Sequence, residues 1–326
     1  MAQYVQFSKH GGPEVLTLAE GPKPEPGPGE VRVRLIAAGL NYIDTYHRTG
    51  YYPVPKLPSG IGLEGAGVVD ALGSGVTDWK TGQRVAFVVT SLGSYAQFRT
   101  VPADRLVVLP DRMEFEQAAG MMLKGMTARY LLRQTYPVSS GETILVHAAA
   151  GGVGLILCQW AAFLGATVIG TVGSPEKAEL ARKNGCAYPV LYREEDVVER
   201  VRDITGGAGV SAVYDSVGKD TLTQSLQCLR PRGLLVSFGQ SSGPVDQFDP
   251  VLLSRHGSLF MTRPTVFHYV ATREELEENT AELFSVVQSG DVTIPVNQRY
   301  TLDQAAEAHR ALENRETTGS TVFLID

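Results

Sequence analysis

A glycine-rich segment at residues 145–155, L-V-H-A-A-A-G-G-V-G-L, contains the residues whose spacing most clearly predicts chemistry. Ala149, Gly151 and Gly154 follow the pattern A-x-G-x-x-G, after a strand-like run and before a helix-like run. Small residues at these positions let the backbone approach a pyrophosphate, and the N–H groups at the start of the helix face its negative charge. The segment therefore predicts a dinucleotide-binding loop. Its predicted cofactor contacts are Gly151, Gly152, Val153 and Gly154.

The segment Gly170–Lys177, at the end of the next predicted strand, favours NADPH over NADH. An NAD site usually has Asp or Glu at the end of the second strand, where it binds the ribose hydroxyls. Here the strand end has no carboxylate, Ser174 and Pro175 suit the start of a helix, and Lys177 lies one turn further on. A helix N-terminus, a hydroxyl and a cation together suit a 2′-phosphate. An ordinary capped helix with a surface lysine is the alternative, and Glu176 is a poorer ribose ligand because it lies inside the helix.

Residues 126–264 alternate between strand-like and helix-like runs. This alternation implies right-handed crossovers and a parallel sheet covered on both faces, so we predict a doubly wound α/β Rossmann domain with a six-stranded sheet. The run 258–262 could pair with its copy across a two-fold axis, so we expect a homodimer. The predicted strands are 143–147, 167–171, 188–191, 210–214, 234–238 and 258–262, and the predicted helices are 152–164, 175–184, 194–204 and 220–229.

Residues 1–125 show a different sequence pattern, with short strand-like runs separated by turns. Glu30–Ile36 alternates with period two, as a half-buried strand does. Further strands are predicted at 65–71, 83–89 and 321–324, and helices at 272–289 and 302–314. The last of these strands could complete the sheet of the first domain. We therefore predict a discontinuous first domain, 1–125 and 265–326, around a Rossmann domain at 126–264.

The 326-residue chain has a composition typical of a globular protein, with 43% hydrophobic and 20% charged residues. A net charge of −6 and the lack of a basic run argue against binding to nucleic acid or anionic lipid. No stretch of 18 apolar residues and no signal-peptide pattern occurs, so we expect a soluble, cytoplasmic protein. Cys158, Cys186 and Cys228 are far apart in the sequence, and we expect buried reduced thiols.

Two N-terminal motifs, together with the glycine-rich loop, resemble those of the medium-chain dehydrogenase/reductase superfamily. The motifs are Gly39–Tyr46 (G-L-N-Y-I-D-T-Y) and Gly60–Gly67 (G-I-G-L-E-G-A-G). Within the superfamily the chain resembles, over essentially its whole length, the quinone oxidoreductases related to zeta-crystallin, particularly bacterial NADPH:quinone reductases. The resemblance implies a GroES-like, mostly-β catalytic domain beside the Rossmann domain, NADPH as cofactor and a quinone as substrate.

The chain departs from the zinc alcohol dehydrogenases of this superfamily at the metal-ligand positions. Asn41 and Leu63 stand where those relatives have a cysteine and a histidine, and residues 120–127 contain no Cys or His. A catalytic zinc needs three protein ligands in one site, so we predict that no metal is bound. Without a Lewis acid, alcohol oxidation is disfavoured, whereas a quinone or conjugated enone accepts hydride with less electrophilic help.

The resemblance implies that the nicotinamide lies in the cleft between the domains, near Asn41, Tyr46, Tyr52 and Thr127. Asn41 could bind the cofactor or polarise a carbonyl, and Tyr46 and Tyr52 could line an aromatic quinone pocket or relay a proton. Lys124 is a second possible proton donor. Structural roles for Lys124 and the two tyrosines remain open. Further cofactor contacts implied by the resemblance are Gly173, Ser174, Lys177 and Tyr192 at the adenosine phosphate, and Ser216, Phe238, Gly239, Ser241, Arg263 and Arg315 elsewhere.

Two other functions compete with quinone reduction. The first is NADPH-dependent reduction of the C=C bond of enones or enoyl thioesters, which also needs only hydride delivery. The second belongs to another class, a non-catalytic NADPH-binding or RNA-binding protein like some relatives of zeta-crystallin. The acidic charge and the lack of a basic patch count against RNA binding.

Overall fold

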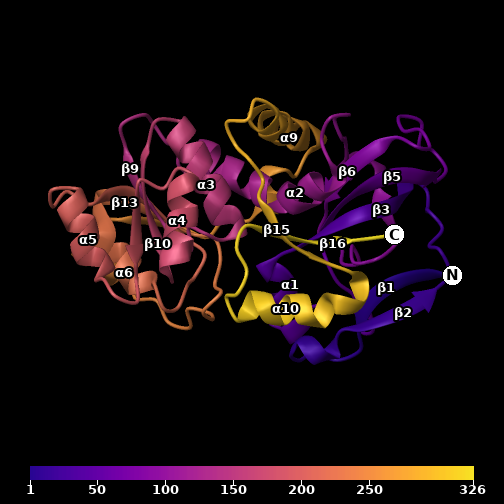
Figure 1. The fold of residues 1–326 in the computed structure, drawn as a ribbon, viewed down its shortest axis with the longest axis horizontal. Helices are drawn as coiled ribbons and strands as arrows, with labels where there is room; N and C mark the ends of the chain where they lie inside the picture. Colours follow the sequence, from indigo (N-terminus) through magenta and orange to yellow (C-terminus); the bar gives the residue numbers. More distant parts are fainter. The chain divides into compact units, whose positions relative to one another are not determined.

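The computed structural model describes all 326 residues, which form two compact units (Figure 1). The first unit consists of Met1–Met126, Val270–Ala281 and Ile294–Asp326, and the second of Thr127–Tyr269 and Glu282–Thr293. The first unit is discontinuous, and its first two boundaries lie close to the expected ones. The division differs from the predicted one at Glu282–Thr293, which belongs to the second unit.

Contacts of helix α9 (Arg273–Gln288) explain this difference. Glu282 accepts hydrogen bonds from Nε of Arg129 at 2.7 Å and from Nε of Arg133 at 2.9 Å. Beyond the helix, the backbone N–H of Thr293 donates to Gln159 Oε1 at 2.8 Å. These partners lie more than a hundred residues away in the sequence, so a local helix pattern could not reveal them.

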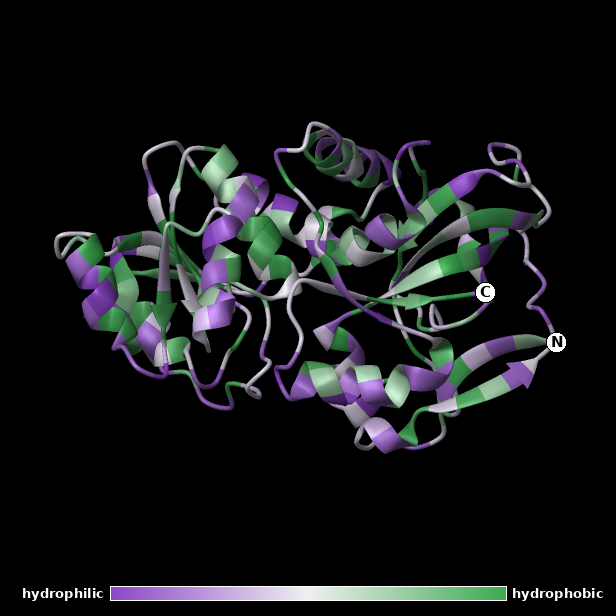
Figure 2. Ribbon diagram, viewed as in Figure 1, coloured by the Kyte–Doolittle hydropathy of each residue, from purple (hydrophilic) through white to green (hydrophobic).

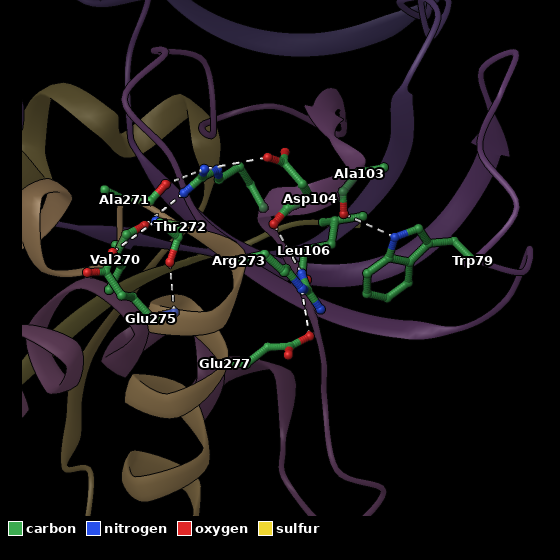
Figure 3. Close-up of polar contacts among 11 residues, drawn as sticks. Trp79, Ala103, Asp104, Leu106, Val270, Ala271, Thr272, Arg273, Glu275 and Glu277 are labelled. Carbon is green, nitrogen blue, oxygen red and sulfur yellow. Dashed lines mark hydrogen bonds and ion pairs between the residues drawn. The ribbon is translucent and has the colours of Figure 1, made fainter.

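The start of α9 is anchored within the first unit by two arginines. Arg105 donates to the carbonyl oxygens of Val270 and Ala271, at 2.8 and 2.7 Å. Arg273 donates to the carbonyl oxygen of Leu106 (Figure 3). The two guanidinium groups thus donate to backbone carbonyl oxygens on both sides of this contact, and they fasten the returning chain to the sheet of the first unit.

The second unit contains the predicted six-stranded sheet, in the order β11-β10-β9-β12-β13-β14 with every pair parallel. The chain order reverses between β9 and β12, and α/β sheets bind ligands at the carboxyl ends of strands beside such a reversal. The strands are β9 (Thr143–Val146), β10 (Thr167–Val172), β11 (Tyr188–Leu191), β12 (Val210–Asp215), β13 (Leu229–Ser237) and β14 (Phe260–Thr262). The helices are α3 (Gly152–Phe163), α4 (Pro175–Lys183), α5 (Val197–Ile204), α6 (Leu222–Cys228), α7 (Val251–Arg255) and α8 (Val266–Tyr269).

The central strands of this sheet are buried on both faces. Ile144, Leu145 and Val146 of β9 have no exposed surface, and every residue of β12 is buried. Figure 2 shows that both hydrophobic and hydrophilic residues occur along the flanking helix α4. Burial of both faces explains why these strands read as continuous apolar runs rather than as alternating ones.

The first unit is built on antiparallel strands, except that β15 and β16 pair in parallel. Its seven-stranded sheet has the order β15-β16-β3-β5-β6-β8, with β7 paired to β3, and a three-stranded sheet has the order β2-β1-β4. The last strand pairs with β3 (Thr321 opposite Leu40), so the prediction that it completes the N-terminal sheet is confirmed. The strands are β1 (Ala2–Phe7), β2 (Thr17–Gly21), β3 (Glu30–Leu40), β4 (Ser59–Gly60), β5 (Glu64–Leu72), β6 (Arg84–Val88), β7 (Phe98–Pro102), β8 (Leu106–Val108), β15 (Val296–Tyr300) and β16 (Ser320–Leu324).

Two helices of the first unit were not predicted. Residues 1–125 were expected to form strands and turns, but α1 (Tyr42–Thr49) lies within this range and α2 (Phe115–Tyr130) begins within it. The helix predicted at 302–314 is present as α10 (Ala305–Glu313). Helix α2 carries buried residues around its circumference, including Ala118, Ala119 and Met121, so it lacks the polar stripe that marks a surface helix. Helix α1 is short and rich in tyrosine, a residue of modest helix propensity.

Candidate active site

The glycine-rich loop joins β9 to α3 at the carboxyl edge of the parallel sheet. Gly151 is the N-cap residue of α3, with an extended backbone (φ −78°, ψ 175°). A Cβ atom at Gly154 would lie 2.9 Å from Cα of Ala149 and closer still to the carbonyl oxygen of Ala148, so this position needs glycine. A Cβ atom at Gly151 would meet only Ala148 O, at 3.2 Å. The loop therefore packs tightly on the sheet and stays open on its outer side, which fits a pyrophosphate at the start of the helix.

The residues predicted to bind a 2′-phosphate follow β10. Ser174 is the N-cap of α4, and its Oγ accepts a hydrogen bond from the backbone N–H of Lys177 at 3.3 Å. The hydroxyl of Tyr192 lies 2.9 Å from the position that a Cβ at Gly173 would occupy, so Tyr192 covers the end of the strand. The predicted helix start is confirmed. The end of β10 itself has no carboxylate, and the acidic side chain nearest in sequence is Glu176, in the first turn of α4.

The carboxyl ends of β12 and β13 form a second loop region of the same unit. Asp215 accepts hydrogen bonds from the backbone N–H groups of Val217 at 2.8 Å and Gly218 at 3.0 Å, so it braces the turn. Arg263 donates to the carbonyl oxygen of Gly239 at 2.9 Å. Backbone hydrogen bonds link Phe238 to Asp215 and Ser241 to Ser216. The predicted cofactor residues that lie in this region are Ser216, Phe238, Gly239, Ser241 and Arg263.

In the first unit, Asn41 belongs to a buried polar cluster with a carboxylate and a cation. Asn41 is the N-cap residue of α1, and its Nδ2 donates to Oε1 of Glu64 at 2.6 Å. Nζ of Lys124 lies 3.2 Å from the same oxygen. The other carboxylate oxygen accepts the backbone N–H of Leu123 at 2.6 Å. Glu64 has no exposed surface, so its charge is balanced within the protein by Lys124.

A second buried chain of polar groups lies beside Asn41. Asp44 accepts the backbone N–H of Asn41 at 2.9 Å and the hydroxyl of Tyr95 at 2.7 Å. The hydroxyl of Tyr95 lies 3.5 Å from His309 Nε2, and Nη1 of Arg48 lies 3.0 Å from His309 Nδ1. Burial raises the pKa of Asp44 to about 7, whereas burial and the Arg48 cation lower the pKa of His309 to about 3. His309 is therefore neutral, and the start of α1 is held by a carboxyl group that titrates near neutrality.

Tyrosines surround Tyr46 on and after α1. The ring centroid of Tyr46 lies 5.2 Å from that of Tyr52 and 5.9 Å from that of Tyr51, both in edge-to-face contact. Tyr42 lies 5.6 Å away on the same helix. Tyr51 is 48% exposed. This aromatic cluster presents flat, apolar ring surface beside polar hydroxyl groups, a combination that suits a planar aromatic ligand.

Two further predicted residues are Thr127 and Arg315. Thr127 lies on α2 and is the first residue of the second unit. Arg315 follows α10 with a left-handed backbone (φ 61°), and its cation lowers the pKa of Tyr42 against the dominant effect of burial, which raises it. The first unit therefore holds Asn41 and Arg315 together with Lys124 and the tyrosines.

Comparison with known proteins gives two family matches. Residues 27–111 match the alcohol dehydrogenase GroES-like domain, and residues 152–285 match the zinc-binding dehydrogenase family. A quinone oxidoreductase of Pseudomonas aeruginosa is 55% identical over 324 residues, which cover 99% of this chain and 100% of that protein. The chain belongs to the quinone oxidoreductases of the medium-chain dehydrogenase/reductase superfamily.

Other members of this family resemble the chain over its full length. The crystal structure of Escherichia coli quinone oxidoreductase complexed with NADPH is 50% identical, has a TM-score of 0.97 and covers 99% of both chains. A 2-haloacrylate reductase of Burkholderia sp is 48% identical over 330 residues, with 99% of each chain covered. The predicted fold class, a Rossmann domain with a GroES-like domain, is confirmed.

As a quinone oxidoreductase, the chain matches a family described as zinc-binding over residues 152–285. No group of three or more His, Cys, Asp or Glu side chains is placed to hold a metal ion. Leu63 is buried in the core, and Asn41 is bonded to Glu64. The three cysteines are buried and form no disulfide, as expected. None of the helices has the length and apolarity needed to cross a membrane.

Three residues of this quinone oxidoreductase site were missed by the sequence analysis. They are Glu64, which bonds both Asn41 and Lys124, Asp44, which caps α1, and Tyr51. A charged residue within an apolar, glycine-rich run was the available signal for Glu64, because such a residue is buried only when it is paired. Asp44 lies three residues after Asn41, the spacing of a capping box, and could have been recognised from it.

Proposed function

We propose that this protein reduces quinones with NADPH and without a metal ion. The relatives named quinone oxidoreductase and the glycine loop support the reaction class. The hydrogen bonds that Glu64 accepts are the observation that supports the metal-free proposal. This carboxylate stands next to Asn41, and both of its oxygens already accept hydrogen bonds, from Asn41 and Lys124 on one side and from Leu123 on the other. A carboxylate held in this way is a hydrogen-bonding partner rather than a metal ligand.

NADPH supplies the hydride, and the protein supplies binding, orientation and a proton. The phosphate loop and the start of α3 bind the pyrophosphate, and Ser174 with Lys177 binds the 2′-phosphate. Asn41 orients the acceptor, because its Nδ2 carries two hydrogens and Glu64 uses only one of them. The second hydrogen donates to a quinone carbonyl oxygen, which stabilises the negative charge that develops there during reduction.

Lys124 provides the proton in this proposal. Its Nζ is buried beside Glu64, within the same cluster as Asn41, and an ammonium group carries three donors of which Glu64 occupies one. The tyrosine cluster around Tyr46 and Tyr52 packs against the quinone ring and excludes water from it. The other cofactor contacts proposed are Thr127, Gly173, Tyr192, Ser216, Phe238, Gly239, Ser241, Arg263 and Arg315.

A steady-state comparison tests the proposal. The metal-free protein, dialysed against a chelator, is assayed with NADPH and with a benzoquinone, a naphthoquinone and a 2-alkenal. We expect full quinone reductase activity after chelation and the highest kcat/KM with a quinone. Loss of activity on chelation that zinc restores would refute the metal-free proposal.

Reduction of an activated C=C bond is the second candidate function, and the full-length likeness to a 2-haloacrylate reductase favours it. A 2-haloacrylate added to the same substrate panel distinguishes the two. If the haloacrylate or the alkenal exceeds the best quinone tenfold in kcat/KM, C=C reduction replaces quinone reduction as the principal activity.

We propose a cytoplasmic location, because the three cysteines are free thiols and form no disulfide. We also propose a homodimer formed through β14. β14 is an edge strand that pairs only with β13, and its Phe260 is 61% exposed. Pairing with a second copy of β14 would cover this edge. Phe260→Lys should shift the mass measured by light scattering from dimer to monomer. An unchanged mass in this variant, or a monomeric wild type, would contradict the proposal.

A further inference from the structure

A chain of buried polar side chains crosses the carboxyl edge of the six-stranded sheet in the second unit. His147, which follows β9, lies at its centre with 1% of its surface exposed. Its Nδ1 is 3.0 Å from Oγ1 of Thr171 on β10, and its Nε2 is 3.0 Å from Oγ of Ser225 on α6. Thr171 Oγ1 accepts the backbone N–H of Ala148 at 3.3 Å, and Ser225 donates to Oδ2 of Asp215 at 2.8 Å.

The direction of each hydrogen bond in this chain follows from its two ends. Asp215 accepts from two backbone N–H groups as well as from Ser225, so the Ser225 hydroxyl donates to it. Ser225 Oγ then accepts from His147, which places the imidazole hydrogen on Nε2. Nδ1 of His147 is left as an acceptor for the Thr171 hydroxyl, whose oxygen accepts from Ala148. Burial lowers the pKa of His147 while Asp215 raises it, and the net lowering agrees with a neutral ring.

The chain ends at two backbone segments that carry proposed cofactor contacts. Ala148 opens the glycine-rich loop and has a left-handed backbone (φ 54°), which costs energy in a residue other than glycine. Its N–H bond to Thr171 and the bond from the Ala149 N–H to Thr171 O, 3.0 Å, hold this conformation. At the other end, Asp215 fixes the turn that contains Ser216.

We propose that His147, as the neutral Nε2–H tautomer, is a positioning residue that couples the glycine-rich loop to the Asp215 turn and so sets the affinity for the dinucleotide. The proposal rests on the proposed binding of NADPH. His147 itself does not touch the cofactor, because both ring nitrogens face Thr171 and Ser225. It acts through Ala148 on one side and through Asp215 on the other.

Substitutions can cut this chain on either side of His147. In His147→Asn the side-chain amide reaches the place of Nδ1, and in His147→Gln it reaches that of Nε2, whereas His147→Leu breaks both hydrogen bonds. We expect His147→Leu to raise the Kd of NADPH at least tenfold, measured by fluorescence titration, and kcat at saturating NADPH to change less than threefold. His147→Asn, which keeps the bond to Thr171, should recover part of the affinity.

A matched control separates positioning from stability. Val213→Ala removes buried apolar volume from the neighbouring strand β12 and should lower Tm without changing any side chain that is hydrogen-bonded in the series from Thr171 through His147 to Asp215. It should leave the Kd of NADPH within twofold of the wild type. If Val213→Ala raises the Kd as much as His147→Leu for a similar loss of Tm, the effect is one of stability and the positioning role is refuted.

Coupling across the imidazole gives a second test. Thr171→Val and Ser225→Ala remove the hydroxyls on opposite sides of His147, whereas Thr171→Ser keeps the hydroxyl and should retain the affinity. Residues that act through one unit give non-additive effects, so the double variant should raise the Kd of NADPH less than the product of the two single effects. Fully multiplicative effects would show that the two ends act independently, which overturns the coupling.

A measurement on the wild type keeps the proposal falsifiable even if every variant fails to fold. In protein labelled with ¹⁵N-histidine, long-range ¹H–¹⁵N correlation spectra distinguish the two neutral tautomers. The imidazole assigned to His147 by its nuclear Overhauser contacts with Thr171 and Ser225 in the wild type should report Nε2–H, and a protonated Nδ1 would overturn the assignment. This result does not depend on NADPH. Absence of any NADPH binding by the wild type would instead refute the proposed function.

Discussion

Nδ2 of Asn41 lies 2.6 Å from Oε1 of Glu64, a carboxylate with no exposed surface. A buried charge is tolerated only when its partners are complete, and here Lys124 supplies the cation. The hydrogen bond orients the Asn41 amide, which lies beside the buried ion pair of Glu64 and Lys124. Glu64 therefore orients the Asn41 side chain, and Lys124 supplies the counter-charge for the buried Glu64 carboxylate.

Removal of one charge of this pair should destabilise the protein. Glu64→Gln leaves the Lys124 ammonium buried without a counter-charge, and Lys124→Met leaves the carboxylate in the same state. Each variant should lose about 3–5 kcal/mol of unfolding free energy in urea titrations. The double variant Glu64→Gln, Lys124→Met should be more stable than either single variant. A double variant as unstable as the sum of the single variants would show that the pair is not coupled.

Loss of the Asn41 amide should impair the chemical step. Asn41→Ala removes the donor assigned to the quinone carbonyl, and loss of one such donor typically lowers kcat about 10²-fold or more. The Kd of NADPH should change much less. Stopped-flow measurement of NADPH oxidation in a single turnover isolates this step. A variant with normal kcat and a raised KM for quinone would place Asn41 in substrate binding alone.

The pKa of Asp44 predicts how stability varies with pH. Burial raises this pKa to about 7, so the folded protein retains a proton that the unfolded chain has already released. The stability contributed by this proton is present at low pH and is lost as the pH rises through 7. Between about pH 4, where the unfolded chain loses this proton, and pH 7 the unfolding free energy of the wild type should fall by up to about 1.4 kcal/mol per pH unit, and the dependence should level off above pH 7.

Two variants check the Asp44 prediction in urea titrations at several pH values. Asp44→Asn cannot titrate, so its unfolding free energy should vary less over the same range. Asp203→Asn is the matched control, because the Asp203 side chain is 70% exposed. This control should reproduce the wild-type slope. An Asp44→Asn slope equal to that of the wild type would assign the dependence to another group.

Local signals in the sequence predicted much of this fold. Ser174 and Pro175 marked the start of α4 correctly, and the apolar runs marked all six strands of the parallel sheet, because these patterns depend on neighbouring residues. The prediction that the last strand could complete the sheet of the first domain was also correct. Expectations based on short-range patterns therefore succeeded where the pattern reflects the burial of the segment itself, which covers both faces of the central strands of the parallel sheet.

The parts that failed depend on contacts distant in the sequence. Glu64 and Lys124 are 60 residues apart, and neither alone indicates that it has the other as its partner. Tyr95 and His309 are 214 residues apart, so the buried chain that ends at Asp44 had no local signature. Helix α2 was missed because burial on all sides removes the amphipathic period. The residues that orient Asn41 thus become visible only in three dimensions.

Lys177 should determine the choice between NADPH and NADH. A charge-assisted hydrogen bond contributes roughly 1.5–3 kcal/mol. Lys177→Ala should therefore raise the Kd of NADPH about 10- to 100-fold and leave that of NADH nearly unchanged, as measured by intrinsic fluorescence. Lys183→Ala, at the opposite end of α4, is the control and should alter neither value. Equal weakening of both cofactors by Lys177→Ala would remove the 2′-phosphate assignment.

Two glycines of the phosphate loop should respond differently to the same substitution. At Gly154 a Cβ would lie 2.9 Å from Cα and C of Ala149, and closer to Ala148 O, so backbone must move and Gly154→Ala should lower Tm. At Gly151 the new atom meets only Ala148 O, at 3.2 Å, and otherwise points to open space. Gly151→Ala should keep Tm within a few degrees of the wild type.

The same two variants separate cofactor binding from folding. In Gly151→Ala the methyl group enters the space assigned to the pyrophosphate, so the KM for NADPH should rise at least tenfold in a protein of normal stability. In Gly154→Ala the loss of affinity should follow the loss of Tm, because the loop itself is displaced. Calorimetry gives the Tm of each variant, and initial rates at varied NADPH concentration give its KM for NADPH. Normal NADPH affinity in Gly151→Ala would show that the pyrophosphate does not approach the loop at Gly151, and the proposed cofactor contact there would be wrong.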